Sequence, residues 1–238
     1  MEKKDINVLE QMQNMTVDLN SKVLIEKAEK DGVETMYKRK LGYKVQCGFG
    51  LQGVCCRNCG MGPCRISAKT PRGLCGADEH TIVGRNFARM VAGGTAAHSD
   101  HARDITHTLA LTKPGGDYQV KEPQKLVEFA KFMDVDPEGK DVYELAHEVA
   151  EVCLMEFGKP FGVSKLLKRA PKVRQEIWHN LGIEPRAIDR EIATVMHSTH
   201  IGCCADLEAI IAMSMRCSMA DGWAGSMIGT MISDILFG

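Results

Sequence analysis

The sequence predicts a mainly α-helical fold interrupted by one loop region rich in cysteine and glycine. Apolar residues recur at three- and four-residue steps through most of the 238 residues, as on the buried face of a helix. The alternation of apolar and polar residues that is typical of strands is scarce. From Cys47 to Gly76 the apolar pattern gives way to Gly, Cys, Arg and Pro, so something other than apolar burial must organise this segment.

The helices can be placed from this spacing and from the residues that end them. One helix is expected to end near Asp31-Gly32, and a long one is expected over residues 86–111, before Lys113-Pro114. Shorter helices are expected at residues 123–133, 141–157, 171–181, 185–197, 206–219 and 225–237. The last is nearly all apolar, so we expect it to be buried in the fold or covered by another domain or chain.

The composition and charge give no indication of a nucleic-acid-binding, membrane or secreted protein. Hydrophobic residues make up 44% and the net charge is −1, with both signs interspersed, which gives no indication of a nucleic-acid or anionic-membrane partner. The first residues do not resemble a secretory signal, and the charge-free run at 222–233 is shorter than the roughly 20 residues of a membrane helix. We therefore expect a cytoplasmic protein, in which ten cysteines suggest metal ligands before disulfides.

Six of the ten cysteines fall in one block, at Cys47, Cys55, Cys56, Cys59, Cys64 and Cys75. An iron–sulfur cubane takes four thiolates, and the last four of these cysteines fit that requirement. The surrounding glycines would let backbone N–H groups approach the cluster, and nearby arginines would supply positive charge. Structural zinc usually uses two Cys-x2-Cys pairs, and only Cys56 and Cys59 have that spacing. The spacing favours iron–sulfur, although composition alone leaves zinc open.

Cys47 and Cys55 remain after this count. Adjacent residues point in different directions, so Cys55 and Cys56 are expected to serve different sites. Two thiolates are half of a cubane's ligand set, and a twofold axis would bring the other half from a second copy. We therefore predict a cluster shared across a homodimer interface. The alternative is that both are simply buried thiols.

The order of cysteines and glycines from Cys47 to Ile66 resembles the N-terminal motif of anaerobic nickel–iron carbon monoxide dehydrogenases. The resemblance extends over nearly all of residues 20–238. Its further motifs lie at residues 73–78, 84–90, 96–101, 168–171, 174–178, 188–191, 220–223 and 233–238.

The resemblance implies an oxidoreductase that converts CO and water to CO2, two protons and two electrons, and that works as a homodimer with a ferredoxin-like acceptor. It implies that Cys56, Cys59, Cys64 and Cys75 hold a relay [4Fe-4S] cluster, and that Cys47 and Cys55 hold half of the shared [4Fe-4S] cluster. The family's nickel–iron–sulfur ligands lie in two further α/β domains. Residues 1–238 are thus predicted to form the N-terminal helical domain, with 47–76 as its cluster-binding segment and no ligand of the nickel cluster.

Histidines at three-residue intervals provide a second candidate site. His98 and His101 fall on one helix face. CO oxidation releases protons, and imidazole titrates near neutrality. The resemblance makes His98 the first member of a proton relay, next to the reacting CO or CO2, and His101 the second. Asp104 replaces the third histidine, and His107 is the fourth. The alternative is a set of surface histidines paired with Asp100 and Asp104.

Asp221, in Ala-Asp-Gly-Trp, matches a family position that faces the catalytic cluster, and the alternative is a helix-capping role. Cys203, Cys204 and Cys217 depart from the family pattern, and we assign them no ligand role. Three hypotheses follow. The chain is the N-terminal part of a carbon monoxide dehydrogenase, truncated or paired with a separately encoded catalytic portion. Otherwise it is a stand-alone iron–sulfur electron carrier or dimerisation module without catalysis, or a zinc-stabilised domain.

Overall fold

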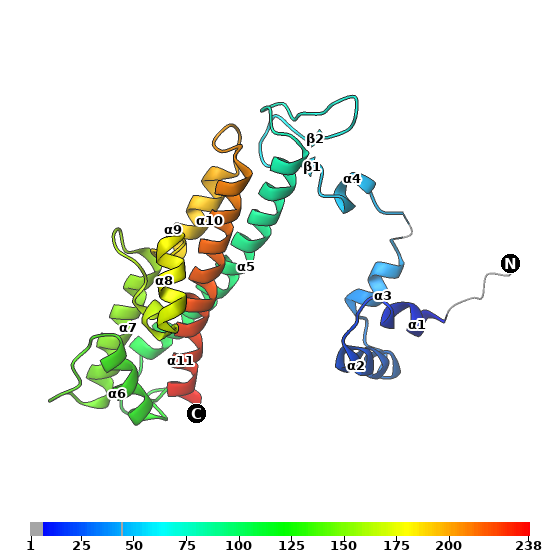
Figure 1. Cartoon of the computed structure of the whole chain (residues 1–238). Coiled ribbons are helices and arrows are strands. Elements are labelled where there is room, and N and C mark those ends of the chain that lie inside the picture. The colour runs from blue at the N-terminus through cyan, green and yellow to red at the C-terminus, as the bar shows by residue number, and fades with distance from the viewer. Residues whose placement is uncertain (1–6, 44) are drawn as a thin grey trace. The chain divides into compact units, whose positions relative to one another are not determined.

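The computed structural model describes residues 7–43 and 45–238, and it confirms the mainly α-helical fold (Figure 1). The chain divides after Gln52 into two compact units. The first contains the helices α1 (Val8–Gln13), α2 (Leu19–Lys30), α3 (Met36–Leu41) and α4 (Gly48–Leu51). The C-cap of α2 is Asp31, where the sequence predicts the end of this helix.

The second unit begins with a small hairpin and continues as a helical bundle. Strands β1 (Cys55–Cys56) and β2 (Cys64–Arg65) pair antiparallel, so Cys56 lies opposite Cys64. The helices that follow are α5 (Glu79–Ala110), α6 (Pro123–Phe132), α7 (Val142–Gly158), α8 (Lys172–Asn180), α9 (Ile188–Ser198), α10 (Leu207–Ala220) and α11 (Ser226–Phe237). A short 3-10 helix, η1 (Lys165–Arg169), precedes α8, and a π-helical segment, η2 (Asp221–Gly225), joins α10 to α11.

Helix α5 is the central element of the second unit, and it packs against α7, α9, α10 and α11. It begins at Glu79, earlier than the predicted Asn86, because the Asp78 carboxylate caps it and accepts the Thr81 backbone N–H at 2.9 Å. The sequence pattern does not indicate this start, because the capping residue Asp78 follows directly on the glycine- and cysteine-rich segment that ends at Gly76.

The main hydrophobic core lies among α5, α6, α7 and α11, around fully buried side chains such as Leu109, Leu126 and Ile232. The fold itself therefore covers one face of the apolar segment 225–237, which agrees with the expectation that this segment is buried in the fold. Helix α11 lies so close to α5 that a Cβ atom on Gly229 would be only 3.4 Å from the Ala102 Cβ. The small residues at these two positions allow this approach. This close approach positions the groove described below.

Two contacts fix the segments around η2. Glu191, which is 1% exposed, accepts hydrogen bonds from Arg186 Nε at 2.7 Å and from Arg186 Nη2 at 2.8 Å. These bonds raise the pKa of the Arg186 guanidinium and tie the start of α9 to the preceding loop. Trp223 of η2 packs on Trp178 of α8, with ring centroids 5.5 Å apart.

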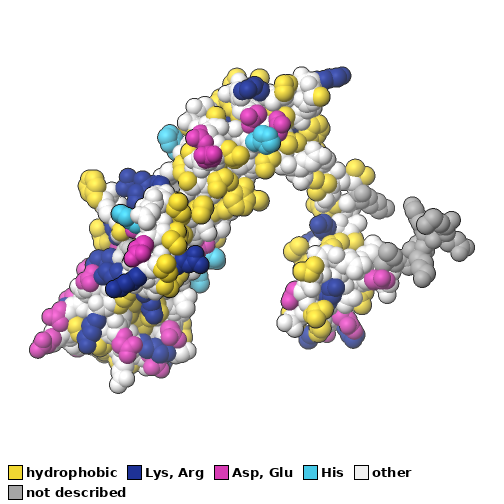
Figure 2. All heavy atoms as spheres, viewed as in Figure 1, with side chains coloured by type: hydrophobic (Ala, Val, Ile, Leu, Met, Phe, Trp, Pro, Cys, Tyr) yellow, Lys and Arg dark blue, Asp and Glu magenta, His cyan; other side chains and the backbone are white. Residues whose placement is uncertain are grey.

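Hydrophobic side chains also gather on the surface, over the part of the second unit where α5 and α10 run side by side (Figure 2). Phe87, Met90 and Met215 are exposed there. Apolar patches of this kind are typical of contact surfaces. Among the described residues, none of the helices has the length and apolar character needed to span a bilayer.

Candidate functional site

The four cysteines predicted to hold the relay cluster line one small cavity in the second unit. Cys56 and Cys64 reach it from the paired strands, Cys59 from the turn between them, and Cys75 from the loop before α5. The remaining lining residues are Asn58, Gly62, Gly73, Leu74, Ile82, Arg85 and Ile201. Within residues 7–43 and 45–238, no three His, Cys, Asp or Glu side chains gather as the ligands of a single metal ion would.

Two glycines lie in the cavity wall, and a side chain at one would crowd the cysteine backbone, whereas a side chain at the other would reach only ordinary van der Waals contact with a thiol. A Cβ on Gly62 would lie 3.2 Å from both the Cys56 carbonyl oxygen and the Cys64 nitrogen, and a Cβ on Gly73 would lie 3.6 Å from Cys64 Sγ. The hairpin is tied to α5 by Asn86, whose amide donates to the carbonyls of Gly53 at 2.9 Å and Cys55 at 3.0 Å.

A buried cation stands at the edge of this cavity. Arg85 of α5 is 2% exposed, and it donates to the Cys204 carbonyl from Nε at 3.1 Å and from Nη2. Its Nη1 lies 3.5 Å from Cys75 Sγ. Among the described residues, no carboxylate forms an ion pair with Arg85. A buried charge is costly unless it is paired, so an anion in the cavity would stabilise this guanidinium.

The polar groups of the cavity fit an iron–sulfur cluster. Burial works to raise the pKa of the Cys75 thiol, but hydrogen bonds from the Ala77 backbone, from Arg85 and from the Gly202 backbone outweigh it and lower that pKa. This favours the thiolate, the form that binds metal. The Asn58 side-chain nitrogen is buried and has no hydrogen-bond partner in the described part of the chain. A sulfide would accept from it, and a thiolate-bound cluster would match the charge of Arg85.

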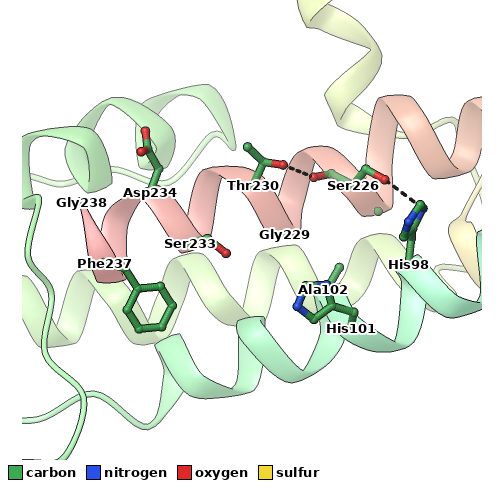
Figure 3. Close-up of a pocket in the computed structure, with 11 residues that line it drawn as sticks. His98, His101, Ala102, Ser226, Gly229, Thr230, Ser233, Asp234, Phe237 and Gly238 are labelled. Carbon is green, nitrogen blue, oxygen red and sulfur yellow. Dashed lines mark hydrogen bonds between the residues drawn. The ribbon is translucent and has the colours of Figure 1, made fainter. Parts of the chain in front are cut away.

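The second candidate site is a groove of about 510 Å³ between α5 and α11 (Figure 3). His98 and His101 line it from α5, one turn apart, with the small residue Ala102 beside them. The opposite wall comes from η2, α11 and the residue after α11, and it includes Gly225, Ser226, Gly229, Thr230, Ser233, Asp234, Phe237 and Gly238.

At one end of this groove, His98, Asp221 and Ser226 form a hydrogen-bonded set. His98 Nδ1 lies 2.8 Å from Asp221 Oδ1 and 2.9 Å from Oδ2, and the Ser226 hydroxyl donates to Oδ1 at 2.5 Å. A carboxylate only accepts, so its contact with His98 places a proton on Nδ1. The Nε2 atom of His98 is then the nitrogen able to accept a proton, and Asp221 holds the ring in that orientation.

The other predicted residues occupy different places. His107 is exposed further along α5 and does not line the groove. Cys47 lies in the first unit, at the start of α4, whereas Cys55 lies in β1 of the second unit, where its side chain points to the face opposite that of Cys56. Cys203 is exposed in the loop between α9 and α10.

Comparison with known proteins places the chain in a family. The model of the Prismane/CO dehydrogenase family matches residues 54–238. The chain belongs to this family. Carbon monoxide dehydrogenase 1 of Methanosarcina acetivorans is 47% identical to it over 228 residues, which are 94% of this chain and 36% of that protein.

Two solved structures resemble this family member. A nickel-free carbon monoxide dehydrogenase from Thermococcus sp. AM4 matches with a TM-score of 0.84 and 46% identity, over 95% of this chain and 37% of that one. An acetyl-CoA synthase/carbon monoxide dehydrogenase, solved with NiZn[Fe4S4] and NiNi[Fe4S4] clusters in its alpha subunits, matches with a TM-score of 0.83 and 34% identity. That match covers 100% of this chain and 37% of the other. The chain thus spans about a third of the length of these relatives.

The sequence does not identify two residues of these sites, Arg85 and Ser226. Arg85 lies in the motif at 84–90, but burial of an arginine cannot be read from its neighbours in sequence. Ser226 follows Asp221 by five positions, a spacing that puts two α-helical side chains on different faces, at about 100° per residue. The π-helical segment η2 changes that relation and brings the two side chains together.

The Asp221 contact yields a prediction for His98. At a pH where the ring is neutral, the nitrogen chemical shifts in NMR should show His98 with its proton mainly on Nδ1. Asp221→Ala removes the acceptor, so the population with the proton on Nε2 should rise. The matched control is Asp104→Ala, which removes a carboxylate from α5, the helix that carries His98. It should leave the His98 shifts unchanged. Equal tautomer populations in the Asp221→Ala chain and the unmodified chain would contradict the assigned contact.

Proposed function

We propose that this chain is the N-terminal iron–sulfur portion of a carbon monoxide dehydrogenase and that it holds the relay [4Fe-4S] cluster. The whole enzyme would convert CO and water to CO2, two protons and two electrons. The observation that carries this proposal is a single cavity that four cysteines line together with the buried Arg85 and with Asn58. Among the described residues, Arg85 forms no ion pair with a carboxylate and the buried Asn58 amide nitrogen has no hydrogen-bond partner. Family membership supports the reaction class.

In this role, Cys56, Cys59, Cys64 and Cys75 would hold the cluster. When bound, a cluster of this type takes up and releases single electrons. The protein supplies the surroundings: the guanidinium charge of Arg85, the Asn58 amide donor and the close-packed backbone at Gly62. Hydrogen bonds and nearby charge are what set the potential of such a cluster.

The groove between α5 and α11 would handle the protons of the reaction. His98 presents Nε2 as a base while Asp221 and Ser226 fix its ring, and His101 lies one turn away in the same groove. Asp104 and His107 continue along α5 toward its C-terminal end and would complete the relay. An electron carrier without catalysis has no evident need for this arrangement, so the groove favours the enzyme over the stand-alone carrier.

Cys47 and Cys55 are proposed as half of a second [4Fe-4S] cluster, completed by the same residues of a second copy in a homodimer. Electrons would then leave to a ferredoxin-like acceptor. The nickel–iron–sulfur cluster would be held by residues outside this chain, in the same polypeptide or a separately encoded portion. Thiolate ligation of this kind suits the reducing conditions of the cytoplasm.

Removing one relay ligand tests the first assignment. Cys64→Ala should lower the iron content and visible absorption of the relay cluster, because it removes one of the four thiolates that hold it. Cys153→Ala is the matched control, since Cys153 is buried in α7 and burial raises the pKa of its thiol, which disfavours the metal-binding form. Equal iron content in the two variants, measured after anaerobic reconstitution, would refute the assignment.

The shared cluster has a separate test. A chain carrying both Cys47→Ala and Cys55→Ala should keep the relay signal in electron paramagnetic resonance but lose one cluster's iron per dimer. Cys203→Ala, which removes an exposed thiol outside the block, should keep the full iron content. If the double variant held as much iron per dimer as the unmodified chain, the proposed sharing would be wrong.

A further inference from the structure

We infer that Arg85 is the internal counter-charge of the relay cluster and that the loop between α9 and α10 holds its guanidinium in place. This inference rests on the proposed function, because it requires a cluster in the cavity lined by Cys75. It assigns a role to a residue, and to a loop, for which the cysteine pattern gives no indication.

The first support is a row of three side chains on one face of α5. Thr81, Arg85 and Arg89 are four positions apart, so they point the same way. All three bind the segment between α9 and α10. The Thr81 hydroxyl donates to the Ala205 carbonyl at 3.1 Å, Arg85 Nε to the Cys204 carbonyl at 3.1 Å, and Arg89 Nε to the Thr199 hydroxyl at 3.0 Å.

The second support is the position of this loop over the cavity. Ile201 is one of the lining residues, and the Gly202 backbone N–H donates to Cys75. Arg85 connects the two parts directly, since its guanidinium binds the Cys204 carbonyl on one side and approaches Cys75 Sγ on the other. The loop therefore holds the Arg85 guanidinium and also donates a hydrogen bond at the same cysteine.

The third support is the difference between the two arginines of the row. Arg89 is half-buried, and its contacts are to Thr199 and the Met196 carbonyl, away from the cysteines. Arg85 is 2% exposed and lines the cavity. Water screens the charge of Arg89 but barely that of Arg85, so only Arg85 should act strongly on an electron added to the cluster.

The test is a redox titration of the reconstituted 238-residue chain, followed by electron paramagnetic resonance of the relay cluster. Reduction adds negative charge, and a nearby cation favours it. R85Q should therefore make one-electron reduction at least about tenfold less favourable, a shift of the midpoint potential by about 59 mV toward negative values. R85K keeps the charge and should stay closer to the unmodified chain.

Two matched variants separate charge from loop attachment. R89Q removes a cation from the same row, and T81V removes a loop contact without changing the charge, so both should leave the potential nearly unchanged. A shift in R89Q or T81V as large as that in R85Q would overturn the charge role, as would an unchanged potential in R85Q.

Iron content distinguishes the remaining outcomes. If R85Q failed to hold iron while R85K and R89Q held it, the requirement for a cation at this position would stand. Loss of iron from both R85Q and R85K would overturn it, because the charge alone would then not suffice. An unmodified chain without any iron–sulfur signal would refute the proposed function itself, whereas an intact signal with no effect of R85Q would refute only the role of Arg85.

Discussion

A positive charge that folding removes from water must meet a negative charge inside the protein, and Arg85 imposes this constraint on the whole cysteine segment. Its neighbours are a thiol and a carbonyl, and among the described residues no carboxylate neutralises it. The cavity beside it is lined by four thiols, whose ionised forms would supply that negative charge. The arrangement is therefore balanced with an anionic cluster and unbalanced without one. The buried amide nitrogen of Asn58, which has no acceptor within the described part of the chain, supports the same conclusion.

Helix α5 connects the cysteine-lined cavity with the groove against α11. Its N-terminal part carries Arg85 and Asn86, which hold the cysteine segment and the loop after α9. Further along, the same helix carries His98 and His101, which line the groove against α11. Arg85 and His98 are separated by about 20 Å along the axis, at 1.5 Å per residue. One helix thus sets the spacing between the cysteine-lined cavity and the groove lined by the two histidines.

Much of this architecture is predictable from sequence, because apolar spacing and capping residues indicate where helices lie. Asp31 and Asp141 stand at the helix boundaries that the pattern indicates. Spacing also predicts that Cys56, Cys59, Cys64 and Cys75 form one group, and these four line one cavity in the structure. What the pattern could not supply were contacts between distant segments. Asp221 meets His98 through the tertiary fold, and Ser226 reaches Asp221 only because η2 departs from α-helical geometry.

The proposed [4Fe-4S] cluster on Cys56, Cys59, Cys64 and Cys75, balanced by Arg85, can be tested by Mössbauer spectroscopy of the chain, purified anaerobically and reconstituted with isotopically enriched iron. We expect the spectrum of a cubane cluster in which cysteine ligates every iron. This component should disappear when those four cysteines are replaced together. A colourless protein that binds zinc at the same cysteines and takes up no iron would contradict the proposed cluster.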